Sequence, residues 1–164
     1  MRHLFALACA LALPVAIQAQ QPNVQVQPPD LHGSRALEKL TESSVVHDYL
    51  ESWQMLGQAL NQNRADLLTA DFAGEALGKF TDTITDQTKF GIHTRYQERG
   101  HNLQIVFYSP DGLSIQLIDT VDYDEQVMSG DKVLATQPMH ARYVAVLTPS
   151  QTRWMVRVLQ TEGQ

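Results

Sequence analysis

The spacing of apolar residues changes along this chain, from helical steps in the first half to alternation in the last third. Between 35 and 60, apolar residues recur at three- and four-residue steps, which predicts an amphipathic helix with one apolar stripe. Ser34 is a suitable N-cap for this helix, and the pair Ser43–Ser44 leaves open whether it is one helix or two. Further apolar stripes predict a short second helix over 64–72 and a third helix over 73–84. The stripe of the first helix consists of Val46, Tyr49, Leu50, Trp53, Leu56 and Leu60.

From residue 103 onwards, apolar and polar residues alternate, which predicts four antiparallel strands over 103–108, 113–127, 142–147 and 153–160. Turn residues separate the strands, with Pro110 and Gly112 in the first turn and Pro149 in the last. A further short strand is expected around 92–96. Helices followed by consecutive strands predict an α+β fold with the helices packed on one face of a sheet.

The N-terminal residues predict a secretory signal peptide followed by a tether. Arg2 provides a positive start, 4–17 is an apolar stretch too short to span a bilayer, and Ala19 stands at a suitable cleavage point. Residues 20–34 are rich in Gln and Pro, which is typical of a flexible spacer. The predicted division is therefore a signal peptide at 1–19, a flexible tether at 20–34 and one folded domain at 35–164, exported to the periplasm or secreted.

Removal of the signal peptide changes the composition in two ways. It removes Cys9, the single cysteine, so the mature chain can form neither a disulfide nor a thiolate metal site. It also removes Arg2, which leaves 11 basic residues against 18 acidic ones and a net charge of −7. A negative surface repels nucleic acid and anionic lipid. We therefore expect no nucleic-acid partner and no membrane insertion after cleavage.

Three features of the chain together point to a known superfamily. They are the long helix carrying Trp53, the helical step at 63–67, and a closing hairpin in which the strand with Tyr143 is followed by a tight turn and a Trp-x-Val strand starting at Trp154. Over 37–160 the chain resembles the nuclear-transport-factor-2-like superfamily with its SnoaL-like members, especially exported bacterial members and the small domain of chloroplast-division proteins. The resemblance implies a cystatin-like cone, in which three N-terminal helices pack in a curved antiparallel sheet.

The same resemblance implies that the outer face of the sheet can form a homodimer. It leaves the function open, because members include isomerases, dehydratases, hydrolases and proteins that only bind ligands or other proteins.

Asp119 is the one carboxylate expected on the apolar face of the second strand. A carboxylate inside the cone could act as a general base, with Tyr49 or Tyr123 beside it as a donor. Two other outcomes stay open. A bulge could turn Asp119 to solvent, or Arg142 or a backbone amide could satisfy it.

No other group of side chains predicts catalytic chemistry. The histidines left after cleavage do not stand at helical metal-pair spacings, and the acidic residues of 119–125 lack the glycine spacing of a calcium loop. No metal and no cofactor are therefore predicted. Trp53 and Trp154 are expected as core anchors that, together with Asp119 and Tyr143, border a pocket.

The resulting prediction is an exported, non-enzymatic domain that binds a small hydrophobic ligand or an envelope protein. The alternative is a small-molecule isomerase, dehydratase or hydrolase that uses Asp119 in the cone. A purely structural docking module would instead expose an apolar patch. That patch would consist of Val106, Tyr108, Ile118 and Leu159.

Overall fold

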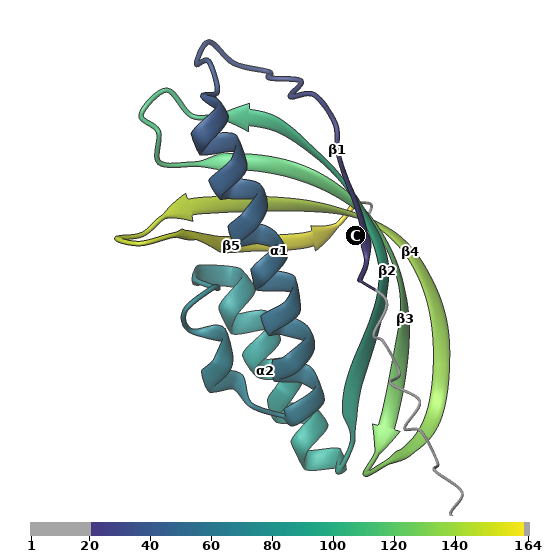
Figure 1. Cartoon of the computed structure of the whole chain (residues 1–164). Coiled ribbons are helices and arrows are strands. Elements are labelled where there is room, and N and C mark those ends of the chain that lie inside the picture. The colour runs from purple at the N-terminus through teal and green to yellow at the C-terminus, as the bar shows by residue number, and fades with distance from the viewer. Residues whose placement is uncertain (1–20, 163–164) are drawn as a thin grey trace, which may run out of the picture.

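Within residues 21–162, a strongly curved sheet of five strands wraps around two helices (Figure 1). The computed structural model describes residues 21–162. The helical elements are α1 (Lys39–Gln62), the 3₁₀ turn η1 (Ala65–Leu68) and α2 (Gly74–Phe90). The strands are β1 (Asn23–Val26), β2 (His93–Tyr108), β3 (Ile115–Ser129), β4 (Lys132–Pro149) and β5 (Trp154–Thr161).

The strands lie in the order β1-β2-β3-β4-β5, with β1 parallel to β2 and the other neighbours antiparallel. β2, β3 and β4 are 15 to 18 residues long. Each of the three long pairings contains a shift of register, including one in β2 between Glu98 and Gly100. Such bulges bend and twist a strand, and they allow one sheet to curve around the helices in Figure 1.

α1 lies against the inner face of the sheet because its apolar stripe faces inward. Tyr49, Trp53 and Leu56 are all at most 2% exposed, as their helical spacing predicts. Ser43–Ser44 does not divide the helix, which is continuous. The sheet supplies the opposite side of the core with alternate residues of its strands. These include Leu103, Ile105, Ile115, Leu117, Val121, Ala145, Leu147 and Val156.

The predicted α+β class and the curved sheet are confirmed, but the number of helices is wrong. Residues 21–162 form two α-helices, and the predicted helix over 64–72 is only the four-residue turn η1. Asn63 ends α1 in the left-handed conformation, which reverses the chain. Leu68 is the one buried residue of η1, and a single turn is enough to bring it to the core.

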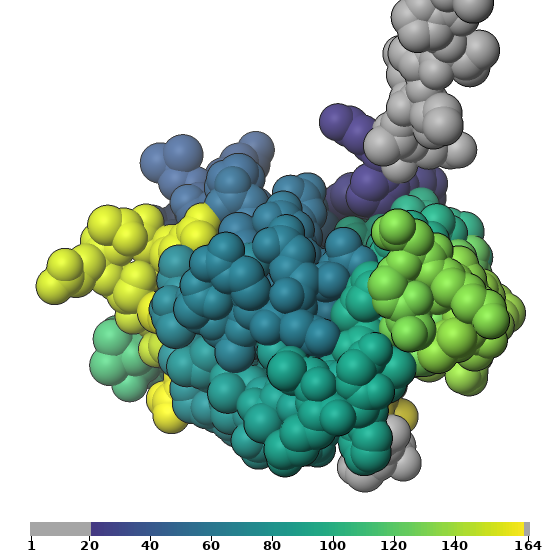
Figure 2. All heavy atoms as spheres, turned by 90° about the horizontal axis from the view of Figure 1, so that it is seen from below, coloured from purple at the N-terminus to yellow at the C-terminus, as the bar shows by residue number. Residues whose placement is uncertain are grey.

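β2 and β4 are longer than predicted, since they begin at His93 and Lys132. The first seven residues of β4 are all exposed, so backbone pairing with β3 forms this part of the strand without any pattern of side-chain burial. Figure 2 shows this region in light green, at one side of the blue and teal helices. Burial patterns cannot locate a strand that is wet on both faces.

The prediction of a flexible tether at 20–34 is wrong for 23–26, which form β1. β1 pairs with 100–103 of β2. The backbone N–H groups of Gln27, Asp30 and His32 then continue to donate to carbonyls of β2 at 2.7–3.0 Å. All four side chains of β1 are exposed, so backbone hydrogen bonds hold this segment. The Val-Gln-Val-Gln alternation at 24–27 fits a strand, but it is short and lies within a stretch rich in Gln and Pro. The predicted signal peptide at 1–19 lies outside the described residues.

No helix within 21–162 combines the length and the apolar character that crossing a membrane requires.

Gly100 lies where β1 passes close to β2. A Cβ there would lie 3.0 Å from the carbonyl oxygen of Asn23, which is backbone and cannot rotate away. We expect Gly100→Val to push β1 off the sheet and to speed amide hydrogen exchange in 23–32 at least about tenfold, while α1 keeps its protection. Gly78→Val is the control, because a Cβ at Gly78 meets no atom within 4 Å. Unchanged exchange in 23–32 of Gly100→Val would contradict a tightly paired β1.

Candidate functional site

A cavity of about 310 Å3 lies inside the cone, lined by α1, α2 and the strands β2 to β5. Apolar residues of both helices and of β5 form much of its wall, including Leu56, Leu60, Phe80 and Leu159. A cavity of this size matches the lower end of the range for small-molecule sites.

Three tyrosines from three strands converge on this cavity: Tyr96, Tyr123 and Tyr143. The Oη atoms of Tyr123 and Tyr143 are hydrogen bonded at 2.9 Å. The Trp53 ring centroid lies 5.2–6.2 Å from those of all three tyrosines. Burial is the main cause that raises the pKa of each tyrosine, and the charge of Glu125 adds to it. The three hydroxyl groups therefore stay protonated at physiological pH.

Glu125 places a carboxylate in the same cavity. It pairs with Tyr96 across β2 and β3, lines the cavity and forms no ion pair with any residue of 21–162. Lys79 also lines the cavity, but its ammonium group donates to the carbonyl of Leu159 at 3.3 Å and lies 5.7 Å from the centroid of the Phe80 ring. The charge of Glu125 is therefore not neutralised by a direct protein partner within these residues.

Several polar atoms of the lining residues lack a hydrogen-bond partner within the described part of the chain. They are Gln87 Oε1, Thr161 Oγ1 and Trp53 Nε1. Gln87 is only 8% exposed, and its Nε2 donates to Thr94 Oγ1 at 2.9 Å. A buried polar atom without a partner costs about 1–3 kcal/mol. A ligand that pairs with these atoms would recover part of that free energy.

Asp119 is the centre of a separate, closed polar cluster in the core. It is fully buried, and its Oδ2 accepts a hydrogen bond from Tyr49 Oη at 3.0 Å and lies 2.7 Å from His101 Nδ1. The other imidazole nitrogen, His101 Nε2, lies 3.3 Å from Glu98 Oε2. Asp119, Tyr49 and His101 do not line the cavity. Trp53 does line it, and its ring centroid also lies 5.6 Å from that of His101.

The charges of this cluster follow from its contacts. Burial alone would lower the pKa of His101, but hydrogen bonds to Asp119 and Glu98 outweigh it and raise the pKa to about 9. His101 is therefore an imidazolium at neutral pH, and both of its N–H groups donate to carboxylates. Burial, and next the charge of Asp119, raises the pKa of Tyr49 well above its usual value. Tyr49 thus remains a donor to Asp119.

A bulge in β2 makes this cluster possible. Residues 98 and 101 would face opposite sides of a regular strand, but the register shifts between Glu98 and Gly100. Glu98 then pairs with Tyr123 and His101 with Val121, so both side chains face inward. β3 keeps its regular pairing around Asp119, which faces inward and not to solvent. His101 and Tyr49, and neither Arg142 nor a backbone amide, bind its Oδ2, while Oδ1 is buried without a partner among the described residues.

The residues proposed for catalysis are therefore divided between two places. Asp119 and Tyr49 meet as expected, but away from the cavity, while Tyr123 lines the cavity without contacting Asp119. Of the residues predicted to border the pocket, Trp53 and Tyr143 do so.

Trp154 does not border the cavity. Its ring packs on Tyr108 with the centroids 6.4 Å apart, and it borders a shallow surface depression near the turn between β4 and β5. The prediction is wrong because Trp154 starts β5 at the end that is remote from the three tyrosines of the cavity. Trp154 pairs with Pro149, whereas Thr161 at the other end of β5 lines the cavity.

Two important residues, Glu125 and His101, were not predicted as site residues. The odd-numbered residues from 113 to 123 are predicted to face inward. Continuing this alternation by two residues places Glu125 on the same inner face of β3. His101 stands two residues before the buried Leu103, so the same rule places it inside. Gln87 and Thr161 carry no comparable signal, because a polar residue in an amphipathic segment is expected to face water.

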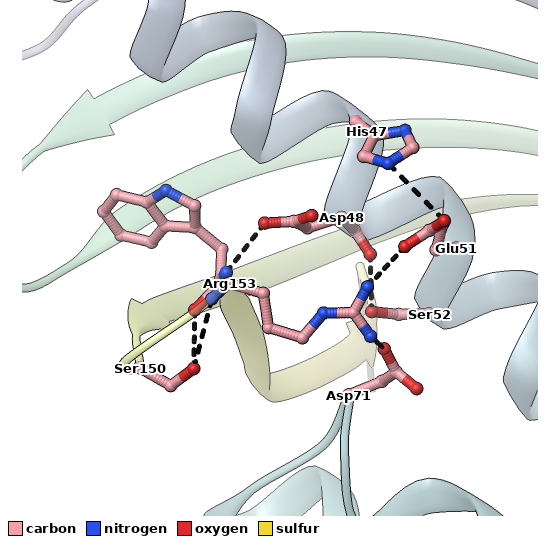
Figure 3. A network of polar contacts seen from close by, with 8 residues as sticks. His47, Asp48, Glu51, Ser52, Asp71, Ser150 and Arg153 are labelled. Atoms are coloured by element: carbon pink, nitrogen blue, oxygen red, sulfur yellow. Dashed lines mark hydrogen bonds and ion pairs between the residues drawn. The ribbon is translucent and has the colours of Figure 1, made fainter.

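A second polar network joins α1 to the turn between β4 and β5 (Figure 3). Arg153 forms ion pairs with Glu51 of α1 and with the buried Asp71. Asp48 Oδ2 accepts a hydrogen bond from the backbone N–H of Trp154 at 2.8 Å. Burial raises the pKa of Asp71 despite the opposing charge of Arg153. These contacts position β5 against α1 and form one wall of the cone.

The same network contains a set of side chains that could approach a metal ion. Ligand atoms of His47, Asp48 and Glu51 lie within 4.8 Å of one another. Both carboxylates are already engaged, Asp48 by the Trp154 amide and Glu51 by Arg153. The arrangement is therefore explained by its protein partners.

No protein-family description and no curated protein matches this sequence. Solved structures do match. The intermembrane-space region of the chloroplast protein ARC6 aligns with a TM-score of 0.63 at 14% identity, covering 77% of this chain and 98% of that one. A protein from Kribbella flavida aligns with a TM-score of 0.51 at 9% identity, over 73% and 90% of the two chains. A scytalone-dehydratase-like protein from Novosphingobium aromaticivorans gives 0.50 at 15% identity, over 74% and 85%.

At such low identities these likenesses concern the fold alone. They agree with the curved sheet and the inner helices in Figure 1. This chain therefore adopts the nuclear-transport-factor-2-like cone fold, which the SnoaL-like proteins share.

Proposed function

We propose that this chain is an exported, non-enzymatic binding domain that holds a small molecule in the cone cavity. The observation that carries the proposal is the cavity of about 310 Å3, in which aromatic rings occur together with polar atoms that have no partner within 21–162. Small-molecule sites typically combine an apolar, aromatic lining with a few polar groups that orient the ligand. Tyr96, Tyr123, Tyr143 and Trp53 supply the first feature, and Gln87 supplies the second.

The position of Asp119 favours binding over catalysis. A general base must come within hydrogen-bond reach of the substrate. Asp119 is 0% exposed and does not line the cavity, so its unpartnered Oδ1 is out of reach of a ligand there. The cluster of Asp119, Tyr49 and His101 instead connects α1, β3 and β2 through the core. We infer that its role is to hold the helix inside the sheet.

The enzymatic alternative has one observation in its favour, which is that Glu125 reaches the cavity beside tyrosine hydroxyls. An isomerase, dehydratase or hydrolase built on this cone would use Glu125, and not Asp119, as its base. Chemical conversion of a bound ligand that is lost in Glu125→Gln would favour this alternative.

Export, partner binding and dimerisation are further parts of the proposal. The docking module with an apolar patch at 106, 108, 118 and 159 finds little support, because Val106, Tyr108 and Leu159 are at most 7% exposed. A homodimer through the outer face of the sheet remains our proposal for the assembled state, to be measured together with ligand binding.

Native mass spectrometry of the chain purified gently from an exporting host tests the proposal. We expect cleavage near Ala19 and a retained small molecule in the wild type. Thr83→Trp should abolish the retained mass, because Thr83 of α2 lines the cavity. Thr85→Trp is the matched control. Thr85 lies on the same helix, and its hydroxyl, like that of Thr83, donates a hydrogen bond to the carbonyl four residues earlier. Unlike Thr83, it does not line the cavity.

The same two variants are then titrated with a panel of small aromatic and ammonium compounds, and binding is observed through chemical-shift changes of the 15N-labelled chain. Two outcomes would contradict a ligand site in the cavity. One is a wild-type protein that carries no extra mass and shows no saturable binding, and the other is binding that Thr83→Trp and Thr85→Trp weaken equally.

A further inference from the structure

The charge inside the cone cavity is unevenly distributed. Glu125 contributes a carboxylate that no basic side chain within 21–162 pairs with, and the neighbouring tyrosines stay neutral. The one ammonium group of the lining, that of Lys79, donates to the carbonyl of Leu159 and lies over the Phe80 ring. Glu125 and Lys79 therefore carry opposite charges in the lining without pairing with each other. Lys79 is solvent-exposed, whereas Glu125 lies beside the tyrosines, so the aromatic side of the cavity is the negative one.

Aromatic rings surround this charge. Glu125 pairs with Tyr96 across the two strands and lies on the same face of β3 as Tyr123. The rings of Tyr96 and Tyr123 are 4.9 Å apart and tilted by 55°, and those of Trp53 and Tyr143 are 5.2 Å apart and tilted by 77°. Tilted aromatic rings beside a carboxylate are the arrangement that attracts an organic ammonium group, through the negative faces of the rings and through direct charge.

A second, independent observation points the same way. Gln87 Oε1 is a buried acceptor without a donor within the described residues, on a side chain that is 92% buried and lines the cavity. An acceptor of this kind is satisfied by a ligand that donates hydrogen bonds or carries positive charge. A carboxylate ligand would instead bring like charge towards Glu125.

We propose that the cone cavity selects small ligands that carry an ammonium group, with the cation held between the Glu125 carboxylate and the rings of Tyr96, Tyr123, Tyr143 and Trp53. This rests on the proposed function, since it names the class of ligand for the same cavity. The net charge of −7 expected for the mature chain adds a long-range attraction for cations. The volume of about 310 Å3 limits the ligand to a small molecule.

The test compares choline with its neutral carbon analogue 3,3-dimethylbutan-1-ol, which has nearly the same shape, and with the anion 3,3-dimethylbutanoate. Binding is followed by chemical-shift changes of the 15N-labelled chain. We expect choline to bind at least about tenfold more tightly than the neutral analogue, and the anion to bind least. Signals of β2, β3 and α2 around the cavity should be the ones that move.

Glu125→Gln should weaken choline binding about tenfold and leave the neutral analogue unaffected. The control is Asp122→Asn, which removes the same charge from the outer face of β3, where Asp122 contacts the exposed His140. Thermal unfolding of both variants establishes that they fold.

Equal or tighter binding of the neutral analogue would overturn the ammonium inference and leave the cavity as a ligand site. An equal loss of choline affinity in Asp122→Asn would also overturn it, because the effect would then come from net charge. If choline does not bind, the ammonium inference is wrong. The proposed function is tested separately, by the retained mass in the wild type, Thr83→Trp and Thr85→Trp.

Discussion

Replacing Asp119 by asparagine is expected to lower the free energy of unfolding by about 3 kcal/mol at pH 7, since removal of one partner leaves a buried charge uncompensated. Asp119 Oδ2 accepts from Tyr49 and His101, and all three side chains are at most 3% exposed. Asparagine has nearly the same shape but no negative charge to offset the imidazolium of His101. Urea unfolding followed by circular dichroism measures the difference.

The same variant should change the dependence of stability on pH. The folded-state pKa of His101 is raised from 6.5 to about 9, so its contribution to stability is complete below pH 6.5 and is lost as the pH rises towards 9. We expect the wild type to lose about 1–3 kcal/mol over this interval. Asp119→Asn should lose much less, because His101 no longer gains its main partner on folding.

Asp122→Asn is again the control, because Asp122 also contacts a histidine, but an exposed one, at 2.7 Å. It should leave the pH dependence of the wild type in place. A wild-type slope that persists in Asp119→Asn would show that His101 is not the group that titrates.

The second large effect is expected for Trp53→Ala, which should destabilise the fold by about 3–5 kcal/mol. Trp53 is 2% exposed and contacts His101 on one side and three tyrosines of the cavity on the others. Its loss would remove packing from α1 and join new empty volume to the cavity. Thermal and urea unfolding measure the change.

Trp154→Ala is the matched substitution, because Trp154 is only half-buried and packs at the edge of the core against Tyr108. Its cost should be clearly smaller than that of Trp53→Ala. Equal costs would contradict the central position that we assign to Trp53.

The inner face of the cone could be predicted well from residue types alone. The helical spacing placed Tyr49 and Trp53 on the buried side of α1, and the alternation of β3 placed Asp119 and Tyr123 inside. These predictions succeed because burial repeats with the period of each helix or strand, so the pattern can be recognised within a short stretch of sequence. The α+β class follows from the same patterns.

The pairs that give the interior its chemistry could not be predicted in this way. His101 meets Asp119 because a bulge after Glu98 resets the inward face of β2, and a bulge depends on pairing with another strand. β1 is held mainly by backbone hydrogen bonds, and the short Val-Gln-Val-Gln alternation at 24–27 does not indicate which strand it pairs with. The alternation implies that Glu125 faces inward. That it lies beside Tyr96 follows only from the pairing of β3 with β2.

The sequence therefore encodes which side of each element is buried, because that depends on local periodicity. Which side chains meet inside the cone depends on strand register, bulges and the docking of α2, and these are settled by contacts between residues far apart in the chain. The separation of a closed cluster around Asp119 from an open cavity around Glu125 belongs to this second kind, and it is the feature on which the proposed function depends.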